Sequence, residues 1–231
     1  MISVIIPTYN EADQIAKTID LVLQAADEYP IEIIVVDGGS TDETISIAKA
    51  AGSLTITSQS KGRGSQMNQG AMFATGEILY FLHADSQPPV HFTRYIMDAL
   101  EKGASSGCFR LAFDHDHWFL KANAWFTRFN VNAVRFGDQS LFVKKNVFLQ
   151  SGRFREDLVV MEDQEIIHRI RGSGKFVVMN AVVTTSARKY HENGIYRMQW
   201  IFFRIWLLFY LGYTQDHIVK VYKNLIRKHK L

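Results

Sequence analysis

Cysteine is almost absent from this 231-residue chain. The one cysteine, Cys108, excludes an internal disulfide framework and a zinc site built from several cysteines. A reducing compartment is compatible with this, so we expect a cytoplasmic protein. The opening MISVIIPTYNEA has no basic stretch before its apolar run, which favours a first strand over a signal peptide.

Three further absences narrow the function. The chain contains neither a GxGxxG turn nor a phosphate loop ending in Gly-Lys-Ser/Thr, which weakens the dinucleotide-binding and P-loop interpretations. Lys and Arg number 26 against 23 Asp and Glu, so the chain is not a polycation that binds nucleic acid. The apolar segment 198–213 is interrupted by Arg204 and is shorter than the roughly 20 residues that span a bilayer.

Short apolar runs rich in β-branched residues alternate with segments of helical periodicity in the first half. Such alternation predicts an α/β fold, with a mostly parallel sheet and helices on both faces. The expected strands are 2–6, 31–36, 54–57 and 78–82, and the expected helices are 11–28, 41–51 (capped by Ser40 or Thr41) and 65–74.

The second half is less regular but is not separated by a linker, a repeat or a low-complexity tract. Strands are expected at 108–113 and 141–143, and helices at 118–129 and 163–171. We therefore expect one domain over 1–195, with a nucleotide-binding half (1–86) and an acceptor half (87–195). A C-terminal helical segment, 196–231, would pack on that domain.

Polar residues follow the ends of three expected strands: Asn10 and Glu11, then Asp37, then His83 and Asp85. In parallel sheets, ligands bind beyond the carboxyl ends of the strands. A binding site is therefore predicted at this edge.

Four blocks in order, VIIPTYNEA, IIVVDGGSTDET, KGRGSQMNQGA and LYFLHADS, resemble the nucleotide-binding half of family 2 glycosyltransferases. The resemblance implies a GT-A type fold and inverting transfer of a sugar from a UDP- or GDP-sugar to a hydroxyl acceptor. It assigns to the donor nucleotide Pro7, Tyr9, Asn10, Glu11, Asp37, Gly38, Lys61, Arg63, Asn68, Gly70, Ala84 and Arg188.

Two of these positions have a definite chemical rationale. Asp37 can accept a hydrogen bond from a uracil N3–H or a ribose hydroxyl, and Arg63 lies in a glycine-flanked loop before a helix, where cations hold diphosphate oxygens. Taken alone, the Asp37 segment is more typical of an ordinary turn followed by a helix cap. Lys61 taken singly could equally belong to a solvated basic loop.

His83-Ala84-Asp85 stands where the family carries its DXD motif, whose carboxylate binds a divalent ion. Asp85 would provide an oxygen ligand for Mg²⁺ or Mn²⁺, and His83 would shift the preference towards Mn²⁺. His83 could equally be a hydrogen-bonded residue at a strand end. His191 matches a C-terminal metal-binding histidine of some GT-A enzymes, although a lone histidine in a polar loop is more often simply exposed.

Glu162-Asp163 matches the family's ED motif at the start of a helix. Inverting transfer needs a carboxylate that takes the proton of the acceptor hydroxyl, and the match assigns this role to Asp163. Without the other blocks, two acidic residues at a helix N-terminus would only complement the helix dipole.

Asp138 and Gln139, followed by LFVKK, resemble a block of a short bacterial branch that includes arsenosugar-related transferases, and would face the acceptor. Asp138 could instead order the turn before strand 141–143. The aromatic segment after residue 195 could be core, a homodimer contact or a membrane-surface helix at the inner face of the membrane. Two rival functions remain, a polyprenyl-phosphate sugar synthase with a lipid-linked acceptor and a noncatalytic nucleotide-sugar-binding protein.

Overall fold

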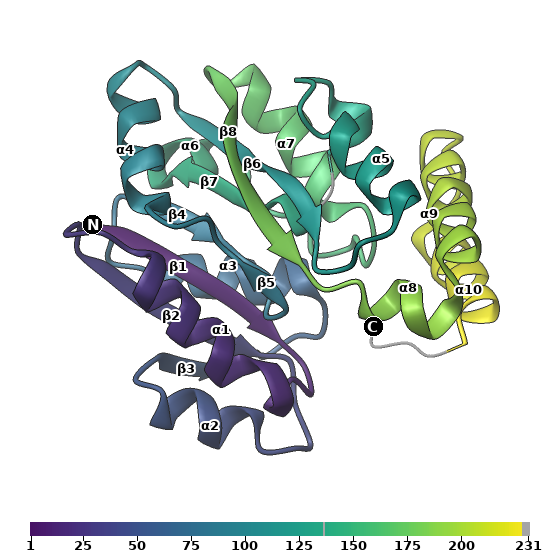
Figure 1. Cartoon of the computed structure of the whole chain (residues 1–231), viewed down its shortest axis with the longest axis horizontal. Helices are drawn as coiled ribbons and strands as arrows, with labels where there is room; N and C mark the ends of the chain where they lie inside the picture. The colour runs from purple at the N-terminus through teal and green to yellow at the C-terminus, as the bar shows by residue number, and fades with distance from the viewer. Residues whose placement is uncertain (136, 228–231) are drawn as a thin grey trace.

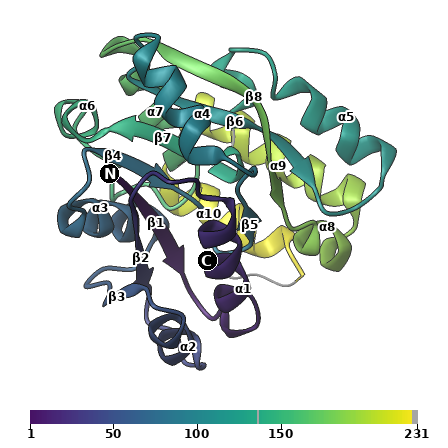
Figure 2. The same cartoon turned by 60° about the vertical axis from the view of Figure 1, so that its left-hand side comes forward.

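The protein is described by a computed structural model over residues 1–135 and 137–227. One eight-stranded sheet runs through it in the order β3-β2-β1-β4-β7-β6-β8-β5 (Figures 1 and 2). The strands are β1 (Ile2–Thr8), β2 (Ile31–Asp37), β3 (Leu54–Thr57), β4 (Ile78–Phe81), β5 (Ser86–Gln87), β6 (Ser106–Phe113), β7 (Leu141–Lys144) and β8 (Phe176–Thr185).

The first four strands are parallel, whereas β7 is antiparallel to both β4 and β6. β6 and β8 are again parallel, and β5 pairs antiparallel with β8. The chain adds β2 and β3 on one side of β1 and then returns to add β4 on the other side. The predicted α/β fold with a mostly parallel sheet is confirmed, and the switch point of the sheet lies between β1 and β4.

Helices cover both faces of the sheet because side chains alternate along each strand. Val4 and Ile6 of β1 pack under α1, α2 and α4, while Ile5 packs under α3, α6 and α7. The bounds are α1 (Ala12–Ala25), α2 (Thr44–Ala50), α3 (Arg63–Phe73), α4 (Phe92–Glu101), α6 (Lys145–Gln150) and α7 (Glu162–Gly172).

A third apolar cluster joins the C-terminal helices to the acceptor half (Figure 1). Met198, Ile201 and Ile205 contribute its buried centre, and Leu120 and Tyr190 pack against it from outside the last two helices. The elements involved are α5 (Trp118–Phe126), α8 (Arg188–Asn193), α9 (Ile195–Tyr210) and α10 (Gln215–Leu225). Within the described residues, no helix is both long and apolar enough to cross a bilayer.

The main departures from the expected elements are local. The second helix begins at Thr44 rather than near Thr41, because Ser40 and Thr41 hydrogen-bond to Asp37 and Asn10 instead of capping it. Asp42 Oδ1 accepts from the Thr44 amide at 3.1 Å and so orders the start of α2. Helix α5 ends at Phe126, and the sequence did not predict β5, α4, α6, β8 or α8.

Candidate active site

A cleft of about 700 Å³ opens at the carboxyl ends of β1, β2 and β4. Its walls include Thr8 and Tyr9 on one side of the switch point, and His83 and Asp85 on the other. Twelve of the predicted site residues line it: Pro7, Tyr9, Glu11, Gly38, Lys61, Arg63, His83, Ala84, Asp85, Asp138, Asp163 and Arg188.

The loops after β1 and β2 are held together by side-chain hydrogen bonds. Asp37 is fully buried, and its Oδ2 accepts from the backbone amides of Gly39 and Ser40, each at 2.8 Å. Asn10 has a positive φ of 52° and accepts from the Thr41 amide at 2.8 Å. Both side chains shape the loops, while neighbouring Gly38 and Tyr9 line the cleft.

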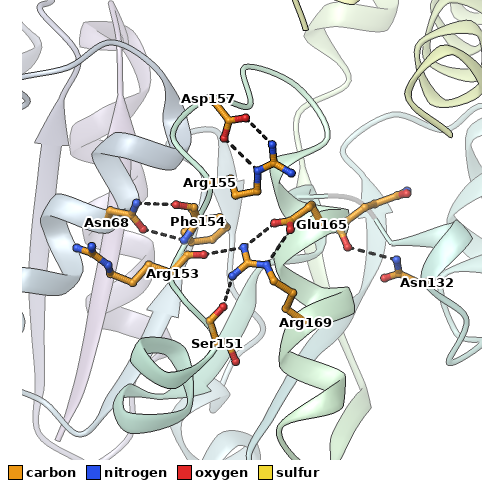
Figure 3. Close-up of polar contacts among 10 residues, drawn as sticks. Asn68, Asn132, Ser151, Arg153, Phe154, Arg155, Asp157, Glu165 and Arg169 are labelled. Atoms are coloured by element: carbon orange, nitrogen blue, oxygen red, sulfur yellow. Dashed lines mark hydrogen bonds and ion pairs between the residues drawn. The ribbon is translucent and has the colours of Figure 1, made fainter. Parts of the chain in front are cut away.

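Helix α3 begins at the cleft with Lys61 and Arg63 but packs deep in the molecule further along. Asn68 Nδ2 donates to the Phe154 carbonyl at 2.8 Å (Figure 3). A Cβ on Gly70 would lie 2.5 Å from Cγ2 of Ile5, so this glycine permits the close approach of the helix to the sheet. Neither Asn68 nor Gly70 lines the cleft.

The turn after β4 brings His83 and Asp85 to the cleft beside Asp138. His83 Nδ1 and Asp138 Oδ1 are 2.9 Å apart. Burial acts to lower the pKa of His83, but the hydrogen bond to Asp138 and the negative charges of Asp138 and Asp163 together outweigh it, so the pKa is raised. Burial acts to raise the pKa of Asp138. The hydrogen bond to His83 and the positive charges of His83, Lys189 and Arg63 outweigh this effect, so the pKa is lowered.

Asp85 is the carboxylate in this group to which no hydrogen bond or ion pair is made from the described residues. Burial raises its pKa, and the nearby negative charge of Asp138 raises it further. A cation at Asp85 would relieve both effects, so the position fits a divalent ion. The described part of the chain contains no group of three or more His, Cys, Asp or Glu side chains that could hold a metal. Mg²⁺ is usually bound by one or two carboxylates, and substrate phosphates complete its coordination.

The predicted base lies at the start of α7. Met161, which precedes the helix, has a positive φ of 69°, a conformation that non-glycine residues rarely adopt and that clusters at functional sites. Asp163 lines the cleft next to Gly137, where a Cβ would lie 2.0 Å from Asp163 Oδ2. Gly137 therefore provides the space that the Asp163 carboxylate occupies.

Glu162 does not line the cleft and is 1% exposed. Its Oε1 lies 2.8 Å from Arg63 Nη2, so α7 is tied to the start of α3. Neither carboxylate oxygen has an aligned hydrogen bond within the described residues, which makes the contact an ion pair of imperfect geometry. Burial raises the pKa of Glu162, and Arg63 offsets part of that rise.

The far side of α7 is anchored to the loop before it (Figure 3). Arg169 Nε donates to Glu165 Oε1 at 2.8 Å, and Nη2 donates to the Arg153 carbonyl at 2.7 Å. The same guanidinium reaches the Ser151 carbonyl, and Asn132 donates to the Gln164 carbonyl at 3.2 Å. These contacts fix the orientation of the helix that carries Asp163.

Two basic residues from α8 complete the polar end. Arg188 Nη2 donates to both Glu11 carboxylate oxygens, at 3.1 and 3.2 Å, and Lys189 also lines the cleft. His191 lies elsewhere, with its ring centroid 4.1 Å from that of His115. Gln139 is 1% exposed and donates to the Phe109 carbonyl at 3.1 Å, so it too lies outside the lining.

The sequence offered no sign that the C-terminal helices close the cleft. Phe202 and Trp206 of α9 and Tyr222 of α10 line its apolar end, together with Phe113 and Val160. The Trp206 indole N–H is buried without a hydrogen-bond acceptor in the described structure. An apolar group with an oxygen atom near that N–H would suit this end.

Comparison with solved structures agrees with this fold. A mannosyltransferase from Pyrobaculum calidifontis, solved with GDP-Man and Mn²⁺, superimposes with a TM-score of 0.71 at 19% identity, over 97% of this chain and 69% of that one. S. aureus TarS in complex with UDP-GlcNAc gives 0.63 at 15% identity, over 97% and 71% of the two chains. These similarities establish a GT-A-like fold.

Relatives in sequence match shorter segments. Glycosyltransferase AglE of Haloferax volcanii is 34% identical over 114 residues, which is 46% of this chain and 34% of that protein. An undecaprenyl-phosphate 4-deoxy-4-formamido-L-arabinose transferase of Serratia proteamaculans is 32% identical over 131 residues, 52% and 40% of the two chains. The match thus spans well under half of each relative. The model of the family described as glycosyl transferase family 2 matches residues 3–155, and the chain belongs to that family.

Proposed function

We propose that the protein is an inverting glycosyltransferase that moves a sugar from a nucleoside diphosphate sugar to a hydroxyl acceptor with the help of a divalent metal. The observation that carries the proposal is that Asp85 and Asp163 both line one cleft, at the switch point of the sheet, without hydrogen bonds from the described residues. Neighbours of the same fold bind GDP-Man with Mn²⁺ and UDP-GlcNAc.

The donor would lie across the polar end of the cleft. Gly38 and Tyr9 flank the space for the nucleoside, and the cations Arg63, Arg188 and Lys189 are available to the diphosphate. Asp85 would hold Mn²⁺ or Mg²⁺, which neutralises charge on the departing diphosphate. His83 would support this position through its bond to Asp138.

Asp163 would act on the acceptor. Its carboxylate takes the proton of the acceptor hydroxyl as that oxygen bonds to the anomeric carbon and the bond from this carbon to the diphosphate oxygen breaks. Attack opposite the leaving group inverts the anomeric configuration. The apolar end, next to Phe202 and Trp206, would hold the rest of the acceptor.

A lipid-linked acceptor is the second candidate, favoured by that apolar end and by the undecaprenyl-phosphate transferase among the relatives. The buried free thiol of Cys108 supports a cytoplasmic location. Membership of the short bacterial branch that includes arsenosugar-related transferases stays a prediction from motifs.

A thermal-shift screen of UDP-, GDP-, CDP- and dTDP-sugars, with and without Mn²⁺, tests the proposal. A ligand that binds the native state raises its apparent stability, so we expect a metal-dependent rise in Tm with one nucleotide class. Release of the nucleotide on addition of acceptor then distinguishes transfer from binding alone. Binding of a donor without turnover under any condition would support the noncatalytic alternative, and no shift with any donor would refute the proposed donor site.

A further inference from the structure

Helix α9 carries apolar side chains on two opposite faces. Met198, Ile201 and Ile205 are buried in the third core. On the outward face, apolar side chains recur at every third or fourth residue, as they do along one side of a helix. These side chains are between 40% and 56% exposed. This exposed stripe comprises Tyr196, Trp200, Phe203 and Leu207, and it ends at the half-exposed ring of Tyr210, whose hydroxyl turns back to Gln164.

Helix α5 lies near α9 (Figure 1), and its exposed aromatic side chains add a second apolar surface. Trp118 is 67% exposed, and its ring contacts that of Phe119, which lies 5.0 Å from the ring of Tyr196. At the other end of α5, the rings of Trp125, Phe126 and Phe129 form an exposed cluster, with centroids 5.0 to 6.4 Å apart. Together with the stripe of α9, these side chains form what we call the aromatic face.

Positive charge accompanies the aromatic face. The guanidinium of Arg204 lies 5.3 Å from the ring centroid of Trp200, and that of Arg128 lies 4.5 Å from Trp125. Segments 117–131 and 195–227 contain one acidic residue, Asp216. Their basic residues are Arg128, Arg197, Arg204, Lys220, Lys223 and Arg227, together with Lys121, which forms an ion pair with Asp116 just before the first segment.

We propose that the aromatic face docks on the surface of an anionic lipid bilayer. Aromatic and aliphatic side chains would enter the boundary between headgroups and acyl chains, and the arginines would remain at the level of the lipid phosphates. A second copy of the chain fits less well because docking like faces would bring the two sets of basic residues together.

The docked orientation would bring the cleft close to the lipid. Phe202 and Trp206 of the same helix line the apolar end of the cleft, one residue before and three residues after the exposed Phe203. A lipid-linked acceptor could then reach Asp163 without leaving the bilayer. This last step rests on the proposed function, whereas docking itself does not.

Co-sedimentation of the full chain with vesicles tests the docking without any donor. We expect binding to vesicles of phosphatidylcholine mixed with phosphatidylglycerol, little binding to phosphatidylcholine alone, and weakening as ionic strength rises. Replacing Trp200 and Phe203 together by serine should lower the partition coefficient at least about tenfold, because two large apolar side chains are lost from the interface.

The matched control is Met72→Ser with Phe73→Ser, which removes side chains that are 69% and 51% exposed on α3. It should bind vesicles like the wild type. Equal binding by both double variants, or no binding by the wild type, would overturn the proposal. So would a wild-type dimer that ignores vesicles and that the Trp200/Phe203 variant converts to a monomer. The donor-induced rise in Tm should survive in both variants, so failure here is distinct from failure of the proposed function.

Discussion

At the residue scale, Asp163 and Glu162 are adjacent carboxylates with opposite surroundings. Asp163 faces the cleft, in the space that Gly137 leaves, whereas Glu162 is buried against Arg63. Of the two, Asp163 lines the cleft. The Glu162-Asp163 pair therefore combines a carboxylate that faces the cleft with one that ties α7 to α3.

Asp163→Asn should abolish most of the turnover while leaving donor binding intact. A general base contributes about 10²- to 10⁴-fold, and the amide cannot accept the proton. Steady-state release of nucleoside diphosphate measures the loss, and the donor-induced rise in Tm measures binding. Asp157→Asn is the control, because it makes the same carboxylate-to-amide change in an exposed pair with Arg155 that lies outside the cleft. Near-normal turnover of Asp163→Asn would disprove the assignment.

Glu162 should make the protein less stable as pH rises. Burial raises its folded pKa above the ordinary value of 4.5, so the folded state holds the proton more tightly than the unfolded chain. Its contribution is complete below about pH 4.5 and is lost as pH rises through the raised pKa. Glu162→Gln cannot titrate, so its Tm minus that of the wild type should be larger at pH 8 than at pH 5. A difference that shrinks with pH would mean that Arg63 outweighs burial.

At the element scale, the short turn that contains Gly137 packs against the start of α7, where Asp163 lies. Gly137→Ala would place a methyl group 2.0 Å from Asp163 Oδ2 and 3.0 Å from His83 Cε1. The Asp163 carboxylate can rotate away from the methyl group, so we expect a small change in Tm. We expect kcat to fall on the order of 10²-fold, because a catalytic group misplaced by about 1 Å loses about that much rate.

Gly172→Ala provides the comparison, since nothing lies within 4 Å of the added methyl group at the other end of α7. Normal kcat is expected there, with a gain in stability of about 0.5–1 kcal/mol from the better helix former. Measuring kcat and Tm for both variants separates an effect on the site from a general effect of alanine. Equal kcat values would show that Asp163 does not need the space at Gly137.

The sequence predicted β1, β2 and β4 because these strands are buried on both sides and appear as continuous apolar runs. It missed β8, whose residues range from buried to exposed and whose apolar run is broken by Asn180. The edge that carries Tyr9, Gly38 and Asp85 followed from the strand ends. The contact of Arg63 with Glu162 did not, because no local pattern pairs residues so distant in the chain.

At the scale of the whole molecule, the C-terminal helices are part of the site rather than an addition to it. Periodicity could not predict this, because α9 is apolar on both faces and the sequence does not say which face packs inwards. Several contacts join these helices to the sheet domain. The Phe202 ring of α9 lies 6.0 Å from that of Tyr190, which in turn lies 5.2 Å from Phe113 of β6. The Tyr210 hydroxyl donates to Gln164 Oε1 at 3.1 Å.

Ile201→Ala should therefore destabilise the whole protein in a single transition. Ile201 is fully buried in the third core, and truncation of such a side chain costs about 2–5 kcal/mol. For a chain of this size each kcal/mol lowers Tm by about 2–4 °C. Differential scanning calorimetry should show one peak shifted down, as it should for Ile19→Ala in the opposite core. Because Phe113 packs on both cores, their unfolding should be coupled. A separate early transition for Ile201→Ala, with the main peak unmoved, would instead make the residues after 195 an independent unit.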